Sequence, residues 1–458
     1  MRPDAGNEYQ GVDLGGMLDI MIVATQLSSE SDGFNNNEYD TEASLDFTAA
    51  ASINQLKLAL TNKEPNILLT EDIVTNESFT IDYNVNIDGN GKTIARADAA
   101  AFASREATEP FTGNVFEVTE NSTLELTNVV LDGGAVWTGE YNSVLKRGTV
   151  NAGATATGSL VFVNSKSTAV LGEGVIIKNN VGANAVNVAS GASLIIDGAE
   201  IINNNSSAGA IWGGGSITLN SGKINYNSST GIAGAIRMAS NSSFTMNGGE
   251  IKNNYATTVG GVFWGYNAAT YNFNGGEISG NYAGEAAGVL WPGNKSTINV
   301  RNDVKIINNT STEVGAFRLT NYTSFNMEGG SIYGNRSINN SNTDGIYGWD
   351  ATVKISAGIL ADNITVQGGL TPTVGGKEID GVVNFSISTN HNTCNLLSDF
   401  GVIKFTVAEG ANFSAFNFKP EASYTYTEGD ENKLICMNSG YSTYFDTASN
   451  TFKLKESN

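Results

Sequence analysis

A short phrase recurs along the middle of the chain, and it constrains the fold more than any other feature. GGEIKNN at residues 248–254 is followed by GGEISGN at 275–281. Aligned on its isoleucine, the phrase repeats every 23–28 residues, at Ile177, Ile201, Ile224, Ile251, Ile278, Ile306, Ile332 and Ile359. Three residues further on lie Asn180, Asn204, Asn227, Asn254, Asn281, Asn309, Asn335 and Asp362. Such a period is typical of a solenoid built from stacked repeats.

Each repeat carries two further stretches that are typical of strands. Alternating apolar pairs precede the isoleucine, at Phe244/Met246, Tyr271/Phe273, Ile298/Val300, Phe325/Met327 and Val353/Ile355. A bulky apolar residue lies further upstream, at Ile211, Ile236, Phe263, Leu290, Phe317 and Ile346. Three strands in roughly 25 residues cannot bury their own apolar face, but stacked copies form three parallel sheets around one core. We therefore predict an all-β fold, a right-handed parallel β-helix of about 10–11 coils with asparagines bonded from coil to coil.

The two ends of the repeat have different patterns. Residues 52–60 (SINQLKLAL) predict a helix that caps the first coil, because three apolar residues share one face and Ser52 with Gln55 forms a capping box. After about residue 379 the repeat stops, and alternating stretches at 402–407, 423–427, 433–437 and 451–455 predict an antiparallel β region. We expect three parts: an N-terminal extension (1–47), a β-helix (48–378) interrupted by an excursion at 135–158, and an antiparallel C-terminal cap (379–458).

Composition limits the kinds of partner that we expect the chain to bind. The formal net charge of −21 and the pI of about 4.4 argue against nucleic acid and against anionic membrane surfaces, and favour neutral glycans or proteins. No stretch reaches the ~18 apolar residues of a membrane span, so we expect no membrane insertion. Residues 17–27 carry Asp19 and lack the basic flank of a signal peptide. Because asparagine-rich solenoids are usually exported, we expect an extracellular or cell-surface protein whose export signal is not visible in this chain.

The residues that enzymes of this fold require are sparse. Glu250 and Glu277 are expected on neighbouring coils about 4.8 Å apart, but two carboxylates are too few for calcium, which takes roughly six to eight oxygens. Lys223 and Lys305 flank the pair, so we interpret it as solvated charges and only a weak calcium site. The single histidine, His391, lies beyond the repeat and is expected in a solvated loop. We predict no catalytic residue and no cofactor.

Cys394 and Cys436 are the only cysteines of the chain, so at most one disulfide is possible. Their spacing leaves open whether they pair or remain as two buried thiols.

One outward column of side chains is more informative. The positions that directly follow the bulky apolar residues hold Trp212, Arg237, Trp264, Trp291, Arg318 and Tyr347. Strand alternation places all six outside, along about 24 Å of the solenoid, and we call them the aromatic strip. A row of exposed aromatic rings is suited to binding sugar rings. Two other interpretations remain: the tryptophans and arginines stack on one another, or another segment or subunit covers them.

The chain resembles a known group of proteins. INQLKLAL, VNIDGNGKTI, the GGEIxxN phrases and the ending YTEGDENKLICMNSGYSTYFDTASNTFKL are similar to the adhesin-like β-helix proteins of gut bacteria, within the pectate-lyase-like superfamily. The resemblance covers about residues 48–458. It implies a surface or secreted protein that binds glycans or a cell-surface protein, and it supplies no catalytic motif.

Two other functions remain open. The first is a polysaccharide lyase or glycoside hydrolase, although the chain has neither the Gly-His-Gly nor the Arg-Ile-Lys segment of polygalacturonase-like hydrolases. The second is a filament subunit that self-associates through residues 1–47, with 17–27 pairing onto a neighbour's strand edge.

Overall fold

The computed structural model describes residues 47–97, 111–135, 137–142, 147–150, 156–339, 343–360, 362–367, 373–380, 382–387, 393–407 and 413–457. Residues 1–46 of the expected extension (1–47) and His391 lie outside the described residues, as do the side chains of the excursion between 136 and 155.

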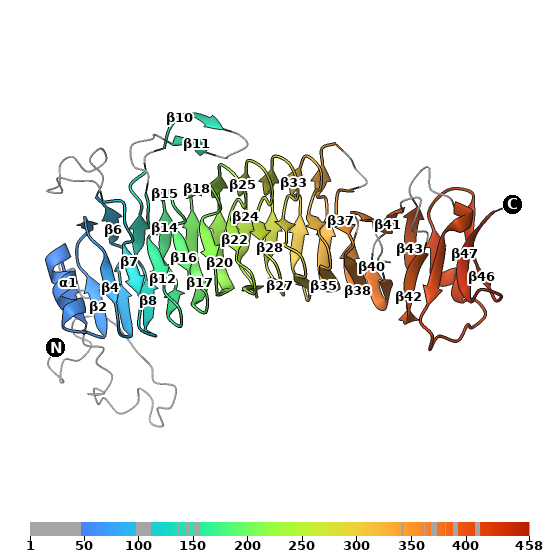
Figure 1. Cartoon of the computed structure of the whole chain (residues 1–458), viewed down its shortest axis with the longest axis horizontal. Helices are drawn as coiled ribbons and strands as arrows, with labels where there is room; N and C mark the ends of the chain where they lie inside the picture. Colours follow the sequence, from blue (N-terminus) through green and yellow to red (C-terminus); the bar gives the residue numbers. More distant parts are fainter. Residues whose placement is uncertain are drawn as a thin grey trace, which may run out of the picture. The chain divides into compact units, whose positions relative to one another are not determined.

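The described strands follow one another as coils that stack along one axis (Figure 1). A representative coil consists of β22 (Ile236–Met238), β23 (Ser243–Met246), β24 (Glu250–Lys252) and β25 (Tyr255–Ala256). Side chains in the first three strands alternate between buried and half-buried. The pattern in the sequence predicted these three strands but missed the fourth, which has two residues. Each strand pairs in parallel with its counterpart in the next coil, so the predicted parallel β-helix is confirmed.

One sheet has 14 strands, all of which follow one another in chain order. They are β4 (Phe79–Ile81), β7 (Phe116–Val118), β12 (Val161–Val163), β16 (Val186–Val188), β19 (Ile211–Gly213), β22, β26 (Phe263–Gly265), β30 (Leu290–Trp291), β34 (Phe317–Leu319), β37 (Ile346–Trp349), β39 (Asn363–Gln367), β41 (Val382–Ile387), β43 (Ile403–Val407) and β45 (Leu434–Cys436).

A second sheet has seven short strands. They are β15 (Val181–Gly182), β18 (Asn205–Ser206), β21 (Ser228–Ser229), β25, β29 (Tyr282–Ala283), β33 (Thr310–Ser311) and β36 (Arg336–Ser337). The solenoid has about nine turns, slightly fewer than the 10–11 coils predicted.

The remaining two faces of the solenoid are joined into a 24-stranded sheet, because strands such as β17 (Ser193–Ile202) run across the corner between them. Its other strands are β1 (Thr48–Ala50), β2 (Asn66–Leu69), β3 (Ile73–Thr75), β5 (Val85–Asp88), β6 (Thr93–Arg96), β8 (Thr123–Thr127), β9 (Val130–Asp132), β13 (Thr168–Leu171), β14 (Ile176–Lys178), β20 (Ser216–Asn225), β23, β24, β27 (Thr270–Phe273), β28 (Glu277–Ser279), β31 (Thr297–Val300), β32 (Lys305–Ile307), β35 (Ser324–Tyr333), β38 (Thr352–Leu360), β40 (Thr373–Asp380), β42 (Thr393–Phe400), β44 (Asn417–Pro420), β46 (Tyr441–Asp446) and β47 (Thr451–Glu456). A separate hairpin joins β10 (Trp137–Asn142) to β11 (Arg147–Val150).

Aromatic and aliphatic side chains fill the space between the sheets. Phe263 of one sheet lies 4.7 Å from Phe244 and 5.7 Å from Phe273 of another, measured between ring centroids. All three are fully buried. Such contacts are repeated from coil to coil, and they make one continuous core of the stacked repeats.

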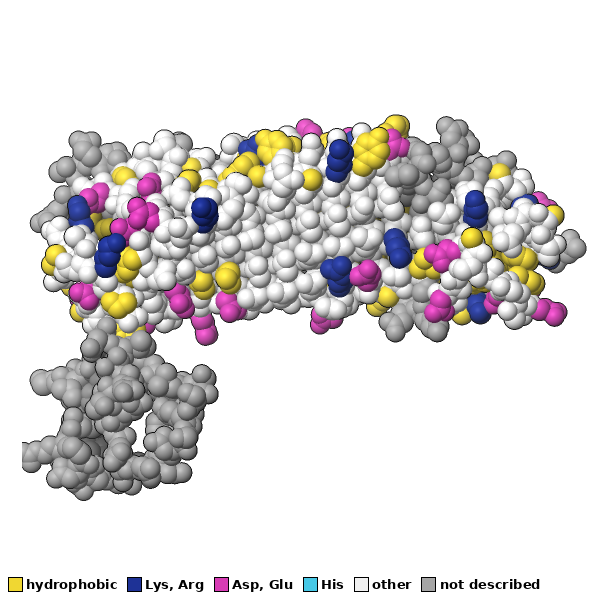
Figure 2. All heavy atoms as spheres, turned by 60° about the horizontal axis from the view of Figure 1, so that its bottom comes forward, with side chains coloured by type: hydrophobic (Ala, Val, Ile, Leu, Met, Phe, Trp, Pro, Cys, Tyr) yellow, Lys and Arg dark blue, Asp and Glu magenta, His cyan; other side chains and the backbone are white. Residues whose placement is uncertain are grey.

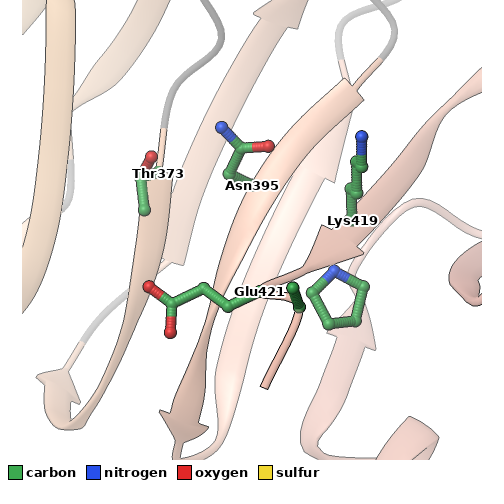
Figure 3. Close-up of a pocket in the computed structure, with 6 residues that line it drawn as sticks. Thr373, Asn395, Lys419 and Glu421 are labelled. Carbon is green, nitrogen blue, oxygen red and sulfur yellow. The ribbon is translucent and has the colours of Figure 1, made fainter. Parts of the chain in front are cut away.

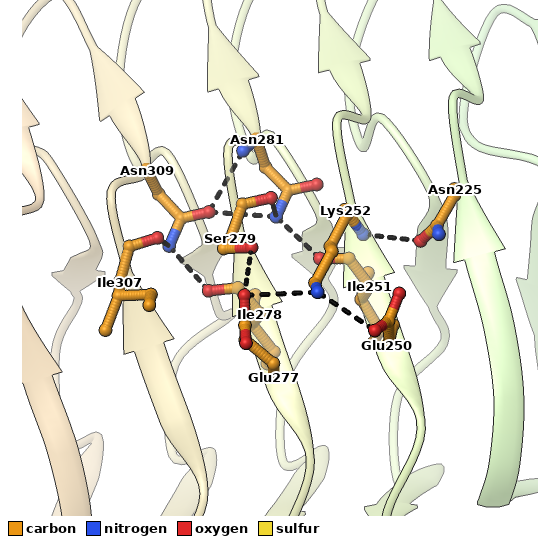
Figure 4. Close-up of polar contacts among 10 residues, drawn as sticks. All are labelled: Asn225, Glu250, Ile251, Lys252, Glu277, Ile278, Ser279, Asn281, Ile307 and Asn309. Atoms are coloured by element: carbon orange, nitrogen blue, oxygen red, sulfur yellow. Dashed lines mark hydrogen bonds and ion pairs between the residues drawn. The ribbon is translucent and has the colours of Figure 1, made fainter.

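The predicted asparagine ladder is confirmed, and its residues are at most 8 % exposed. From Asn180 onward, each backbone N–H donates to the side-chain oxygen of the ladder residue one coil further, at 2.9–3.1 Å. The Nδ2 groups from Asn204 to Asn335 donate to the same oxygens and also to an isoleucine carbonyl of the preceding coil, at 2.7–3.1 Å. Figure 4 shows one step of this ladder, from Asn281 to Asn309. The ladder satisfies buried backbone groups where each coil turns.

Backbone conformation explains why the phrase ends in Asn-Asn or Gly-Asn. The residue before each ladder asparagine has a positive φ of 55–69°, at Asn179, Asn203, Tyr226, Asn253, Gly280, Asn308 and Gly334. Glycine and asparagine tolerate this left-handed conformation better than other residues. The turn therefore selects the residue pair, and stacking repeats the choice in each coil.

Charged groups terminate the ladder at both ends. Arg96, which is 2 % exposed, donates from Nη1 to Asn180 Oδ1 at 2.5 Å and from Nη2 to the Gly113 carbonyl at 2.8 Å. Burial lowers the pKa of Arg96 to about 10. At the other end, Asp362 Oδ2 accepts from both nitrogens of Asn335 at 3.1 and 2.7 Å.

The solenoid begins under a helix, as predicted. α1 (Ile53–Thr61) packs Leu56, Ala59 and Leu60 inward, and the Ser52 hydroxyl accepts from the Gln55 N–H. Gln55 Oε1 in turn accepts from the Ala51 N–H at 2.7 Å. The predicted capping box therefore forms, except that Gln55 bonds to the residue before Ser52 instead of to Ser52 itself.

The predicted antiparallel region at the C-terminus is confirmed, but it is shorter than expected. Parallel pairing continues past residue 379, through β41, β43 and β45 and through β42 and β44. At this end of the described chain, antiparallel pairing is confined to β44 with β47 and β46 with β47. The stretches at 402–407 and 433–437 therefore lie in parallel strands, and 423–427 is not a strand. Short 3-10 helices lie at Phe413–Ala415 and Asp430–Lys433. Cys394 and Cys436 are both reduced thiols that form no disulfide, and burial raises the pKa of each.

Candidate functional site

The aromatic strip lies in register on the outer face of the 14-stranded sheet. Trp212 of β19 pairs with Arg237 of β22, Arg237 with Trp264 of β26, and Trp264 with Trp291 of β30. Arg318 of β34 pairs with Tyr347 of β37, and the neighbouring Leu290 and Phe317 join β30 to β34. The residues on either side in each of these strands point into the core, so all six predicted side chains lie together outside.

Arg237 holds the N-terminal half of the strip together. Its guanidinium carbon lies 4.8 Å from the ring centroid of Trp212, 5.4 Å from that of Trp264 and 5.2 Å from that of Tyr266. Nη2 of Arg237 donates to the Tyr266 hydroxyl at 2.5 Å. The Tyr266 ring also lies edge-on to Trp264, at 4.7 Å between centroids. These cation–π contacts fix the ring planes, so the stacking that the sequence left open is present here.

Arg318 plays the same part in the C-terminal half. Its guanidinium carbon lies 4.3 Å from the Trp291 ring centroid and 5.9 Å from that of Tyr347. Nη1 of Arg318 also forms an ion pair with Glu313 Oε2 at 2.5 Å. The positive charge in this half is therefore balanced within the site.

Stacking leaves part of each ring exposed. All six strip residues are half-buried, and Tyr266 is 39 % exposed. Figure 2 shows hydrophobic side chains beside Lys or Arg side chains along one edge of the solenoid, above a broad face with few charged side chains. The strip thus combines rings held by cation–π contacts with partial exposure to solvent.

Two residues of the site were missed by the sequence analysis. Tyr266 lies two positions after Trp264, and strand alternation would have placed it on the same outward face. Glu313 lies in the turn before β34, where strand periodicity gives no signal. It is positioned by backbone bonds, since its N–H donates to the Glu285 carbonyl at 2.8 Å.

A pocket of about 260 Å³ adjoins the C-terminal end of the strip. It is lined by Glu313, Val314, Arg318, Asn339, Thr343 and Tyr347. Another pocket, of about 280 Å³, lies near the C-terminus and is shown in Figure 3 with Thr373, Asn395, Lys419 and Glu421. This second pocket has no aromatic wall among its lining residues.

The weak calcium pair is bridged by a lysine. Glu250 and Glu277 lie opposite each other on β24 and β28, and Nζ of Lys252 lies 3.0 Å from the first carboxylate and 3.2 Å from the second (Figure 4). Lys223 and Lys305 flank the pair as predicted, since Lys223 lies opposite Glu250 and Lys305 lies opposite Glu277 in the neighbouring strands. The ammonium group of Lys223 also pairs with Glu200 at 2.5 Å.

The surroundings of Glu277 favour its charged form. A hydrogen bond from the Ser279 hydroxyl and the contact with Lys252 hold the pKa of Glu277 below its usual value. Within the described part of the chain, no three His, Cys, Asp or Glu side chains are grouped so as to hold a metal ion.

Comparisons with protein-family models, curated proteins and solved structures find no match for the chain. The fold therefore defines its class, a parallel β-helix with a half-exposed aromatic strip. In the described residues, no helix has the length and apolar character needed to span a membrane.

Proposed function

We propose that the chain is an extracellular, non-catalytic protein of the adhesin-like kind, which binds a neutral glycan along the aromatic strip. The observation that carries this proposal is the register of six side chains on successive coils of one sheet. Neighbouring strands lie about 4.8 Å apart, close to the length of one sugar unit, so successive rings can face successive sugars.

Charge favours a neutral ligand. The chain has a net charge of −21, which repels polyanionic sugars at long range. Within the strip, Arg237 is surrounded by rings and Arg318 is paired with Glu313. Neither guanidinium is placed as a free counter-charge for an acidic polysaccharide.

Retention on immobilised polysaccharides tests the proposal. We expect the chain to be retained by one or more neutral plant, mucin or microbial polysaccharides, with retention that changes little between low and high salt. Retention only by anionic polysaccharides, lost as salt rises, would contradict a neutral ligand.

The same incubations, with calcium added, test the alternative of a lyase or hydrolase. We expect neither new reducing ends nor unsaturated products. Product release that is lost in Glu250→Gln or Glu277→Gln would establish catalysis in place of simple binding.

The filament alternative is tested by assembly state. Size-exclusion chromatography with and without residues 1–47 shows whether oligomers form and whether they need this segment. Assembly that disappears on deletion would favour strand donation between subunits.

A further inference from the structure

We infer that the pocket beside Arg318 binds the terminal sugar of the glycan, and that this sugar is a neutral one bound through adjacent hydroxyls. The inference rests on the proposed binding of a glycan along the strip. It adds which end of the glycan the protein binds and which side chains bind it.

The pocket lies where the aromatic column stops. Tyr347 is the last aromatic residue of the column, because its partner in the next strand of the sheet is Thr365. A glycan that follows the rings from Trp212 therefore reaches the pocket at its end. The pocket volume of about 260 Å³ is below the ~300–1,000 Å³ of sites for drug-sized ligands, and suits one sugar ring better than several.

Glu313 is anchored on both sides of its backbone. Its carbonyl accepts from the Ser337 hydroxyl at 2.8 Å and from the Thr343 hydroxyl, and its N–H donates to the preceding coil. The side chain of Glu313 is 55 % exposed and reaches Arg318, which is itself stacked on Trp291. The carboxylate and the guanidinium are therefore both held at the pocket wall.

This pair offers a donor and an acceptor side by side. A guanidinium carries five N–H donors and a carboxylate has about four acceptor sites, so the ion pair leaves capacity on both partners. Adjacent sugar hydroxyls can each donate to one and accept from the other. Asn339 adds an amide, and the Tyr347 ring provides a wall for the apolar face of the sugar.

The pairing also predicts selectivity. A sugar carboxylate would compete with Glu313 for Arg318 and would be repelled by the glutamate that remains. Glu313→Gln removes this competitor and leaves the guanidinium available, so the variant should accept an acidic terminal sugar.

The test uses matched oligosaccharides that differ only in their terminal unit, a neutral hexose or the corresponding hexuronic acid. We expect the wild-type chain to prefer the neutral form by about tenfold or more, and Glu313→Gln to lose or reverse this preference, since hydrogen bonds to charged groups have such effects. Glu285→Gln is the control. Glu285 is an exposed glutamate one coil away and outside the pocket lining, and its substitution should leave the preference unchanged.

The outcomes separate the proposed function from the inference about the terminal sugar. If no neutral oligosaccharide binds, the proposed function fails. If neutral oligosaccharides bind but wild type and Glu313→Gln show the same preference, only the terminal-sugar inference fails. If Glu313→Gln does not fold, as judged by its thermal transition, Asn339→Ala replaces it as the test variant, because Asn339 is exposed. That variant should weaken binding of the neutral form several-fold, and unchanged binding would overturn the inference.

Discussion

Tyr226 occupies a backbone position that the other coils give to asparagine or glycine. Its φ is 58°, in the left-handed region that costs residues with a bulky side chain about 1–2 kcal/mol. We expect Tyr226→Asn to raise the free energy of unfolding by about 1 kcal/mol. Urea denaturation measures this change, and Asn253→Tyr, the reverse substitution one coil further on, should lower stability by a similar amount. A stability loss in Tyr226→Asn would show that contacts of the tyrosine ring outweigh its backbone strain.

Tyr271 and Gly265 form a coupled pair in the core. The Tyr271 side chain is fully buried, its hydroxyl has no hydrogen-bond partner among the described residues, and burial raises its pKa. A Cβ at Gly265 would lie 2.0 Å from that hydroxyl oxygen. Glycine therefore makes the space that the hydroxyl fills.

We expect Tyr271→Phe to raise the free energy of unfolding by about 1–3 kcal/mol, because a buried polar group without a partner is removed. Gly265→Ala should cost about 1–3 kcal/mol through overpacking. The cost should be smaller in the Tyr271→Phe background, and a double-mutant cycle by urea denaturation measures the difference. Additive effects would contradict the contact between the two residues.

At the scale of single elements, the asparagine ladder ends on an acidic residue. Each ladder asparagine from Asn204 to Asn335 donates its backbone N–H and one side-chain N–H to the next coil toward the C-terminus, which favours a negative charge at Asp362. Burial opposes that charge and is the largest effect, so the pKa of Asp362 lies above its ordinary value of 3.8. A carboxyl group whose pKa is higher in the folded than in the unfolded state contributes most to stability at a pH below its unfolded-state pKa. This contribution is lost as the pH rises through its folded-state pKa.

Asp362→Asn should therefore stabilise the chain at pH 7, because it keeps the ladder and removes a buried charge. The gain should shrink as pH falls from 7 toward 4, because the raised pKa lets Asp362 of the folded wild-type protein take up a proton more readily than it does in the unfolded chain. Urea denaturation of both proteins at the two pH values measures the difference. A variant that is less stable than wild type at pH 7 would show that the ladder stabilises the charge more than burial opposes it.

Other elements show what a sequence can and cannot specify. The Ile and Asn positions of the repeat predicted β24, β28 and the ladder, because stacking forces each coil to repeat its neighbour. The strands of the seven-stranded sheet have only two residues, too few to show alternation. Beyond Asp362 the ladder residue no longer recurs, and alternation alone does not distinguish parallel from antiparallel strands, so the coils through β45 were assigned the wrong pairing.

Of the candidate site, the register of the strip was predictable because one outward position recurs in every coil. The side chains that contact the two arginines were not predictable. Tyr266 and Glu313 lie outside that position, and side-chain contacts with Arg237 and Arg318 depend on rotamers and turn geometry. The sequence therefore predicted the positions of the strip residues, but not the ion pair that balances the charge of Arg318.

At the scale of the whole molecule, a second aromatic pair provides a control for the strip. Tyr255 and Tyr282 lie on adjacent strands of the seven-stranded sheet, and their rings stack at 5.5 Å with an interplanar angle of 3°. They are half-buried like the tryptophans, but they belong to a different sheet. Loss of binding that is specific to the strip can thus be separated from a general effect of removing surface rings.

The most direct measurement is glycan affinity and thermal stability of the Trp264→Ala/Trp291→Ala double variant, compared with wild type and with Tyr255→Ala/Tyr282→Ala. We predict that the tryptophan variant loses glycan retention while its melting temperature stays near that of the tyrosine control, since both tryptophans are only half-buried. The contrary result is that retention persists while the melting temperature falls well below that of the tyrosine control. Large-to-small substitutions at buried aromatic residues cost about 3–5 kcal/mol, so this result would mean that the tryptophans brace the coils and do not bind the glycan.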